Sequence, residues 1–380
     1  MNIAFIITGL SMGGAEMMLY NLASRLSNEF VSHVISLTTI GAVGQRIQTL
    51  GIPVEALGML PEAPNPLSIL RLARRLKEIK PHIVHTWMYH ADLLGGLAAR
   101  MANVPAVAWC IRNSTLDKNV TKWSRRAVVP SCALLSRVLP DRIVSCSRVA
   151  RDIHIAQGYD TGRFIVIPNG FDLNVFHADD GSRNSVRAEL GIPRSALVIG
   201  MFARFHPQKD HQGFFQAAKI LHPVRPDLHF LLAGNDVDHA NPALMDWVHQ
   251  ANVGAVTHLL GPRLDISRLY TALDIYTISS CYGEAFPGVG GEAMACEVPC
   301  VVTNVGDSAY LVGDTGRVVP PSDPAALAKG WAELLDMSEL ERRELGALAR
   351  ARVEEHFDIC SVIRRYEELY HELGRDCEAA

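Results

Sequence analysis

The sequence lacks the paired cysteines of a zinc site or a disulfide framework. Its eight cysteines are scattered and none belongs to a C-x-x-C pair, so we expect reduced thiols and a cytoplasmic protein. No apolar run approaches the roughly 18 residues needed to cross a bilayer. Residues 1–14 are apolar but carry no basic leader, and we expect them to begin with a core strand rather than a signal peptide.

Two nucleotide-binding fingerprints are also missing. G-x-G-x-x-G does not follow any expected strand, and G-x-x-x-x-G-K-[ST] does not occur. The first absence argues against a nicotinamide-dependent dehydrogenase, which remains the less favoured alternative, and the second against a P-loop enzyme. Because no cluster of metal ligands stands out either, we expect neither a metal nor a bound cofactor.

Charge is unevenly distributed along the 380 residues. Residues 1–170 carry 18 Lys and Arg against 10 Asp and Glu, whereas residues 171–380 carry 18 against 30. The excess in the first half indicates either an anionic partner or ordinary solvated surface. Basic residues and a tryptophan surround the apolar stretch 127–139: Lys118, Lys122, Trp123, Arg125, Arg126, Arg137 and Arg142. This segment predicts binding to an anionic membrane surface, the alternative being a core helix interrupted by Pro130.

Short apolar runs alternate with amphipathic stretches, which predicts doubly wound parallel sheets. In the first half we expect strands at 2–8, 31–37, 82–87, 106–111 and 142–146, with helices at 15–26, 67–79, 91–101 and 149–157. In the second half we expect strands at 196–202, 228–233, 256–260, 274–278, 299–303 and 317–319, with helices at 212–221, 243–252, 266–272, 292–296, 325–335 and 340–355.

The turn Pro168-Asn169-Gly170 separates the two series. We therefore expect two Rossmann-like α/β domains, 1–168 and 169–359, that face a central ligand cleft. Informative residues should follow the carboxyl ends of the strands.

Three such segments stand out. Gly13 and Gly14 follow the first strand and open the first helix, where free N–H groups suit a phosphate, although a simple tight turn has the same appearance. Arg204 and Lys209 follow the first strand of the second domain, and two cations around a proline turn suit a diphosphate.

The third segment is glycine-rich and runs from Cys281 to Ala295. It carries Glu284 and Glu292 eight residues apart, with Phe286, Pro287 and Gly288 between them. Carboxylates pair well with sugar hydroxyls, and we place Glu292 at or near the start of a helix. The alternative is that Glu292 only stabilises the start of its own helix.

With these motifs in place, the chain resembles the retaining glycosyltransferases of family 4, which have the two-domain GT-B fold. The resemblance rests on residues 13–16 and 166–172, on Arg204 with Lys209, and on the E-x7-E segment followed by Ala293-Met294-Ala295. It implies transfer of a sugar from a nucleotide diphosphate sugar, a co-substrate rather than a cofactor. The acceptor would be a glycan or lipid-linked glycan of the cell envelope or an exopolysaccharide, and we expect no nucleic-acid partner.

The resemblance also implies roles for residues. Arg204 and Lys209 resemble the diphosphate-binding pair, Glu292 the acid that binds the ribose, and Glu284 the acid near the donor sugar. Residues 286–288 would line the donor site. The backbone at Gly14 would approach the distal phosphate, and a last helix, 360–374, would cross back onto the first domain.

Two points are less direct. His85, near the end of a strand, is a candidate contact to the donor sugar, although a histidine in such a place is more often structural. Glu297 stands where the family usually has glycine, which keeps open a donor-binding protein without turnover. Since no third acid stands out, we expect the cations and helix N-termini to stabilise the leaving diphosphate without a metal.

Overall fold

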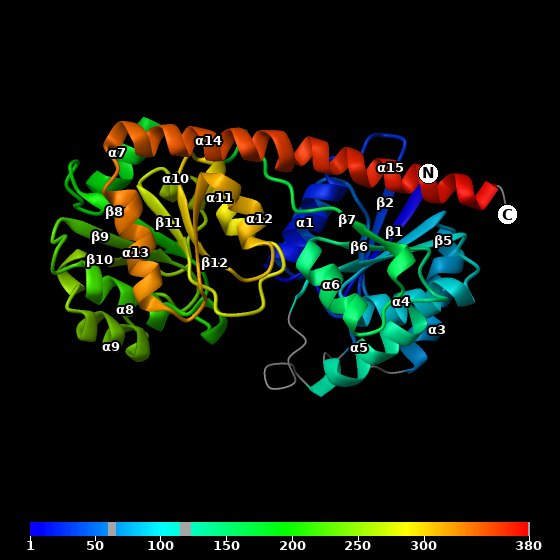
Figure 1. The fold of residues 1–380 in the computed structure, drawn as a ribbon. Helices are drawn as coiled ribbons and strands as arrows, with labels where there is room; N and C mark the ends of the chain where they lie inside the picture. Colours follow the sequence, from blue (N-terminus) through cyan, green and yellow to red (C-terminus); the bar gives the residue numbers. More distant parts are fainter. Residues whose placement is uncertain (60–65, 115–122, 379–380) are drawn as a thin grey trace. The chain divides into compact units, whose positions relative to one another are not determined.

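The computed structural model describes residues 1–59, 66–114 and 123–378 of the chain. Contacts divide it into two units (Figure 1). The first comprises residues 1–170 together with 359–380, and the second comprises residues 171–358. Each unit is a parallel sheet covered by helices, so the expected fold of two Rossmann-like α/β domains is confirmed.

The first unit contains a seven-stranded parallel sheet in the order β3-β2-β1-β4-β5-β6-β7. Its strands are β1 (Asn2–Ile7), β2 (Val31–Ser36), β3 (Val54–Ala56), β4 (Ile83–Trp87), β5 (Ala106–Ile111), β6 (Arg142–Ser145) and β7 (Phe164–Val166). Its helices are α1 (Gly14–Ala23), α2 (Gly41–Gln48), α3 (Pro66–Ile79), α4 (Tyr89–Met101), α5 (Trp123–Leu135), α6 (Arg148–Ala156) and α15 (Ile359–Glu378).

Side chains on the two faces of this sheet form separate cores. On one face the strands pack against α1, α2 and α15, and on the other against α3, α4 and α5. The last helix of the chain, α15, therefore completes a core that the first strands begin. Its buried residues in that core are Ile359, Val362, Ile363, Tyr366, Leu369, Tyr370 and Leu373.

The second unit contains a six-stranded parallel sheet in the order β10-β9-β8-β11-β12-β13. Its strands are β8 (Leu197–Phe202), β9 (Leu228–Ala233), β10 (Thr257–Leu259), β11 (Ile275–Ile278), β12 (Cys300–Thr303) and β13 (Gly316–Val319). Its helices are α7 (Asp180–Glu189), α8 (His211–Leu221), α9 (Pro242–Ala251), α10 (Ile266–Tyr270), α11 (Gly288–Ala295), α12 (Ser308–Val312), α13 (Pro324–Leu335) and α14 (Glu339–Phe357).

The expected strands are confirmed to within two residues at each end, and the structure adds elements that the sequence pattern missed. These are β3, β7, α2, α7 and α12. The strands β3 and β7 have three residues each, too few for a periodic signal. Helix α7 is polar almost all round, since only Val186 and Arg187 are buried.

None of the helices in the described part of the chain is both long and apolar enough to span a bilayer. The basic segment expected to meet a membrane lies partly outside the described residues, namely at Lys118 and Lys122. Trp123, Arg125 and Arg126 belong to α5, whereas Arg137 follows this helix and Arg142 begins β6. Helix α5 contains Pro130 and buries Val129, Cys132 and Ala133 against the sheet.

Candidate functional site

The candidate site in the second unit begins where β8 ends. The backbone at Ala203 and Arg204 lies against Gly234, which follows β9 and has φ +152°. A side chain at Gly234 would overlap the carbonyl of Ala203, so this glycine permits the close approach of the two strand ends. Arg204 is thereby placed at the carboxyl edge of the sheet with its side chain exposed.

A short turn then carries the second cation. Residues Pro207–Lys209 form a single 3-10 turn, and Asp210, at φ 52°, ends it and caps α8 by accepting a hydrogen bond from the Gly213 amide at 2.9 Å. The loop after β11 is tied to this turn, because Ser279 Oγ donates to the Lys209 carbonyl at 2.7 Å and the Cys281 amide donates to the Gln208 carbonyl at 2.9 Å. The turn after β8 and the loop after β11, far apart in sequence, are thus held side by side.

Glu284, in the loop after β11, lies next to Lys209. Lys209 Nζ donates a hydrogen bond to Glu284 Oε1, and Ser280 Oγ donates to the same oxygen at 2.7 Å. The backbone at Glu284 is held by Gly306, which has φ +58° and whose Cβ would overlap the Glu284 carbonyl. Ser280 was not among the residues predicted from the sequence. A serine four residues before an acid, in the loop after a strand, is the signal that could have identified it.

The glycine-rich loop leads into α11. Pro287 caps this helix and Gly288 is its first residue, with open space where a side chain would be. The ring of Phe286 is buried and stacks on Phe171 with ring centroids 6.3 Å apart. Of residues 286–288, only Gly288 therefore has open space beside it. Phe286 packs on the inner side of the loop.

Glu292 lies one turn inside α11 rather than at its start, which corrects the expected position. Helix stabilisation at the N-terminus consequently does not account for it. The Tyr270 hydroxyl donates to Glu292 Oε2 at 2.9 Å and to the Val289 carbonyl at 3.1 Å. Burial raises the pKa of Glu292, while the Tyr270 hydrogen bond opposes that rise.

In the first unit, Gly13 caps α1 and Gly14 is its first residue, as expected. A Cβ at Gly14 would meet nothing within 4 Å, whereas a Cβ at Gly13 would meet the carboxylate of Glu16, which therefore lies beside the helix start. Glu16 follows in the first turn; burial raises its pKa and the positive charge of Arg112 opposes that rise.

The expected role of His85 does not agree with its position. The ring is fully buried between β4 and α15, with its Nδ1 2.8 Å from the hydroxyl oxygen of Tyr370. Burial, reinforced by the charge of Arg112, lowers the pKa of His85 to about 3, so the ring is neutral. A side chain without exposed surface cannot contact a donor sugar, and His85 is a core residue that fixes α15.

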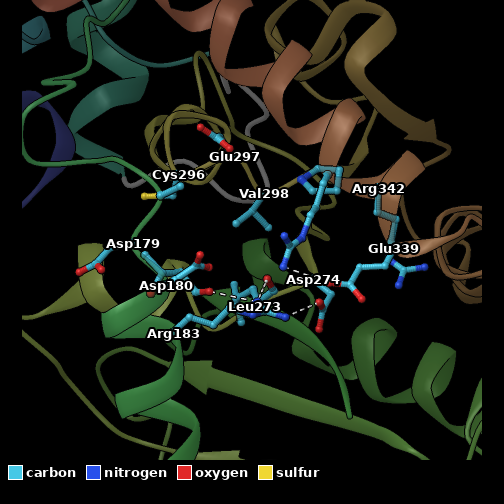
Figure 2. Close-up of a pocket in the computed structure, with 14 residues that line it drawn as sticks. Asp179, Asp180, Arg183, Leu273, Asp274, Cys296, Glu297, Val298, Glu339 and Arg342 are labelled. Atoms are coloured by element: carbon cyan, nitrogen blue, oxygen red, sulfur yellow. Dashed lines mark hydrogen bonds and ion pairs between the residues drawn. The ribbon is translucent and has the colours of Figure 1, made fainter. Parts of the chain in front are cut away.

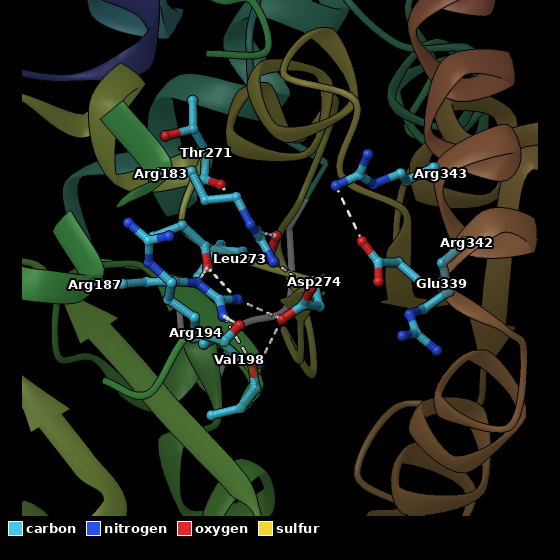
Figure 3. Close-up of polar contacts among 12 residues, drawn as sticks. Arg183, Arg187, Arg194, Val198, Thr271, Leu273, Asp274, Glu339, Arg342 and Arg343 are labelled. Atoms are coloured by element: carbon cyan, nitrogen blue, oxygen red, sulfur yellow. Dashed lines mark hydrogen bonds and ion pairs between the residues drawn. The ribbon is translucent and has the colours of Figure 1, made fainter. Parts of the chain in front are cut away.

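The second unit also has a cavity of about 250 Å³, and it lies at the opposite, amino edge of the sheet (Figure 2). Glu297 and Val298, just before β12, line it together with Arg342 and Glu339 of α14. In Figure 3, Arg183 and Arg187 converge on Asp274, with nitrogen–oxygen distances of 2.7 Å. Two ion pairs, Arg183 with Asp274 and Arg343 with Glu339, lie in the lining of this cavity. None of the predicted donor-site residues reaches it.

Among the described residues, no group of three His, Cys, Asp or Glu side chains is placed to hold a metal ion. The positive charge at the carboxyl edge of the second sheet comes instead from Arg204 and Lys209. Arranged with Glu284, Glu292 and the open start of α11, these cations can bind an anionic group and hydroxyl groups side by side.

Comparison with known proteins gives consistent matches for both halves of the chain. Residues 12–175 match the model described as Glycosyltransferase Family 4, and residues 196–337 match the model described as Glycosyl transferases group 1. A UDP-Gal:alpha-D-GlcNAc-diphosphoundecaprenol alpha-1,3-galactosyltransferase of Escherichia coli is 26% identical over 80% of this chain and 79% of its own length. A D-inositol 3-phosphate glycosyltransferase of Saccharomonospora viridis is 28% identical over 78% and 70%.

Solved structures share the fold. The crystal structure of HepE from Anabaena in complex with UDP has a TM-score of 0.86 at 21% identity and covers 98% of this chain and 100% of its own. The lipopolysaccharide outer core galactosyltransferase WaaB has a TM-score of 0.72 at 12% identity, covering 98% and 99%. At such identities these likenesses concern the fold alone.

Proposed function

Since the chain belongs to the glycosyltransferases of the two-domain GT-B type, we propose that it is a retaining, metal-independent enzyme that uses a nucleotide diphosphate sugar. The acceptor in this proposal is a glycan or lipid-linked glycan of the cell envelope or an exopolysaccharide. The enzyme would work in the cytoplasm, at an anionic membrane surface where its acceptor is lipid-linked. The complex of the Anabaena structure with UDP supports a nucleotide-sugar donor, and the diphosphoundecaprenol acceptor named for the Escherichia coli relative supports a lipid-linked acceptor.

The observation that carries the proposal is the pairing of Lys209 with Glu284 beside Arg204. In a nucleotide diphosphate sugar, the anionic diphosphate is attached directly to a sugar ring that carries hydroxyl groups. A site that binds this molecule therefore needs a cation and a carboxylate in adjacent positions. Lys209 Nζ and Glu284 Oε1 are joined by a hydrogen bond, and Arg204 follows the neighbouring strand end with an exposed side chain. Glu292 supplies a second carboxylate for the ribose hydroxyls.

The reaction then needs little covalent chemistry from the protein. The bond between the anomeric carbon and the distal phosphate oxygen breaks, the acceptor oxygen bonds to that carbon on the same face, and the acceptor proton passes to the leaving nucleoside diphosphate. Negative charge collects on the leaving group, so Arg204, Lys209 and the open start of α11 stabilise the transition state more than the ground state.

A donor screen followed by product analysis tests this function. UDP-, GDP- and ADP-sugars are compared by the rise in melting temperature, with NAD as a control for the dehydrogenase alternative. The best donor is then used for proton NMR of the product, with and without EDTA. We expect the donor's anomeric configuration in the product and turnover that survives the chelator. An inverted product or complete loss with EDTA contradicts the mechanism, and binding without any product favours a donor-binding protein.

A further inference from the structure

Arg112 follows β5 in the first unit and is held against aromatic rings. Its guanidinium carbon lies 4.5 Å from the centroid of the Trp87 ring, in the geometry of a cation–π interaction. Trp87 in turn stacks on Tyr366 of α15, with ring centroids 6.5 Å apart and planes 21° apart. Because β4 and β5 are adjacent parallel strands, this charge is fixed at the carboxyl edge of the first sheet.

Most of the hydrogen-bond donors of this pair have no partner within the described part of the chain. Both terminal nitrogens of Arg112, Nη1 and Nη2, are buried without a hydrogen-bond partner, and so is Nε1 of Trp87. These nitrogens can only donate. The hydroxyl of Thr8, directly after the neighbouring strand β1, is likewise buried without a hydrogen-bond partner among the described residues.

Arg187 in the second unit is a buried arginine with a structural role, and its contacts can be compared with those of Arg112. Its side chain is more deeply buried than that of Arg112, yet Nη1 donates to the carbonyls of Arg194 and Ala196. Its Nη2 donates to the carbonyl of Ala272 and to Asp274. The Glu16 carboxylate supplies a negative charge near Arg112, but Nη1 and Nη2 have no hydrogen-bond acceptor within the described part of the chain. Leaving buried donors unsatisfied is unfavourable, so the guanidinium of Arg112 calls for a ligand that supplies acceptors.

We propose that Arg112, stacked on Trp87, binds a phosphate group of the acceptor substrate. A phosphate offers several acceptor oxygens and no obligatory donor, which complements donor-only nitrogens better than a single sugar hydroxyl does. The inference rests on the proposed function, since it assigns the acceptor to the first unit. Arg112 is partly exposed as a residue while Nη1 and Nη2 are covered, so binding requires a local movement of the groups over them.

Inorganic pyrophosphate is a probe for this site in the full-length protein. Calorimetric titrations are carried out at saturating UDP, which occupies the donor diphosphate site and leaves any second phosphate site to be measured. We expect binding in the wild-type protein that UDP does not abolish. Arg112→Gln should weaken it by at least about tenfold, because a charged bidentate contact is lost, while leaving UDP affinity unchanged. Arg71→Gln, at an exposed position of α3, removes the same charge and should bind pyrophosphate normally.

Arg112→Lys keeps the inference testable if the glutamine variant does not fold. It retains the charge but not the planar fork, and it should fold and bind pyrophosphate more weakly than the wild type. Wild-type affinity in a folded Arg112 variant, or no binding beyond the UDP-sensitive site in the unaltered protein, overturns the inference. Failure of the proposed function is seen separately, as absence of UDP binding or of sugar transfer.

Discussion

Lys209 and Glu284 are 75 residues apart in the chain, and their side chains meet in an ion pair at the carboxyl edge of the second sheet. Ser280 also donates to Glu284, so the carboxylate keeps one partner if the lysine turns away. The cation assigned to the diphosphate and the acid assigned to the sugar thus begin in contact. A ligand that places phosphate and hydroxyl groups next to each other can engage both without moving either far.

Replacement of either cation should affect the chemical step as well as binding. Arg204→Ala and Lys209→Ala should each lower turnover and donor affinity, by about ten- to a hundredfold, since a charged hydrogen bond contributes about 1.5–3 kcal/mol. Steady-state kinetics with varied donor measure both parameters. A change confined to the Michaelis constant would mean that the contact is equally strong before and during bond cleavage.

The two acids should separate in their effects. Glu292→Gln should weaken free-nucleotide binding and raise the donor Michaelis constant, because the ribose is remote from the reacting bond. Glu284→Gln should leave free-nucleotide binding nearly intact and damage sugar transfer. Calorimetry with the free nucleotide, alongside kinetics, distinguishes them. The reverse pattern would show that the two assignments are exchanged.

Nucleotide binding should depend on pH through Glu292. Burial raises its pKa, so the folded protein holds this proton more tightly than the unfolded chain does. Stability contributed by this group is therefore present below its ordinary pKa and lost as pH rises through the raised value. An ionised carboxylate accepts hydrogen bonds from ribose hydroxyls best, so affinity should fall on acidification toward the raised pKa. The Glu292→Gln variant should lack this component when both proteins are titrated across the same pH range.

Glu297 is a position at which a glycine should improve stability. It follows α11 with φ +60°, a conformation that favours glycine, and its carbonyl packs tightly under Gly346 of α14. Glu297→Gly should raise the free energy of unfolding by about 1 kcal/mol, measured by urea denaturation, with activity unchanged. Asn252→Gly is the matched control, because Asn252 has φ 55° and asparagine tolerates that region better. Loss of activity in Glu297→Gly would give this acid a functional role instead.

The sequence allowed the fold and most of the site segments to be predicted because the signals are local. Buried strands give continuous apolar runs, and Arg204, Lys209 and Glu284 lie in the loops that follow such runs. What it could not predict depends on partners distant in the chain. Helix α7 has no apolar stripe to predict it, and it is held by Arg183 and Arg187, which bind Asp274 at separations of 91 and 87 residues. The burial of His85 follows from Tyr370, and that contact spans 285 residues.

The return of α15 to the first unit has a consequence for how the chain is synthesised. The core face built on β1 and β4 stays open until residues 359–373 leave the ribosome, whereas residues 171–358 form an unbroken unit. The domain that starts first therefore finishes last, and its apolar face is exposed throughout translation of the other. A chain ending at Asp358 should bind a hydrophobic dye strongly, and an added peptide of residues 359–378 should reduce that binding. The first unit thus reaches its full core only after α15 has been synthesised.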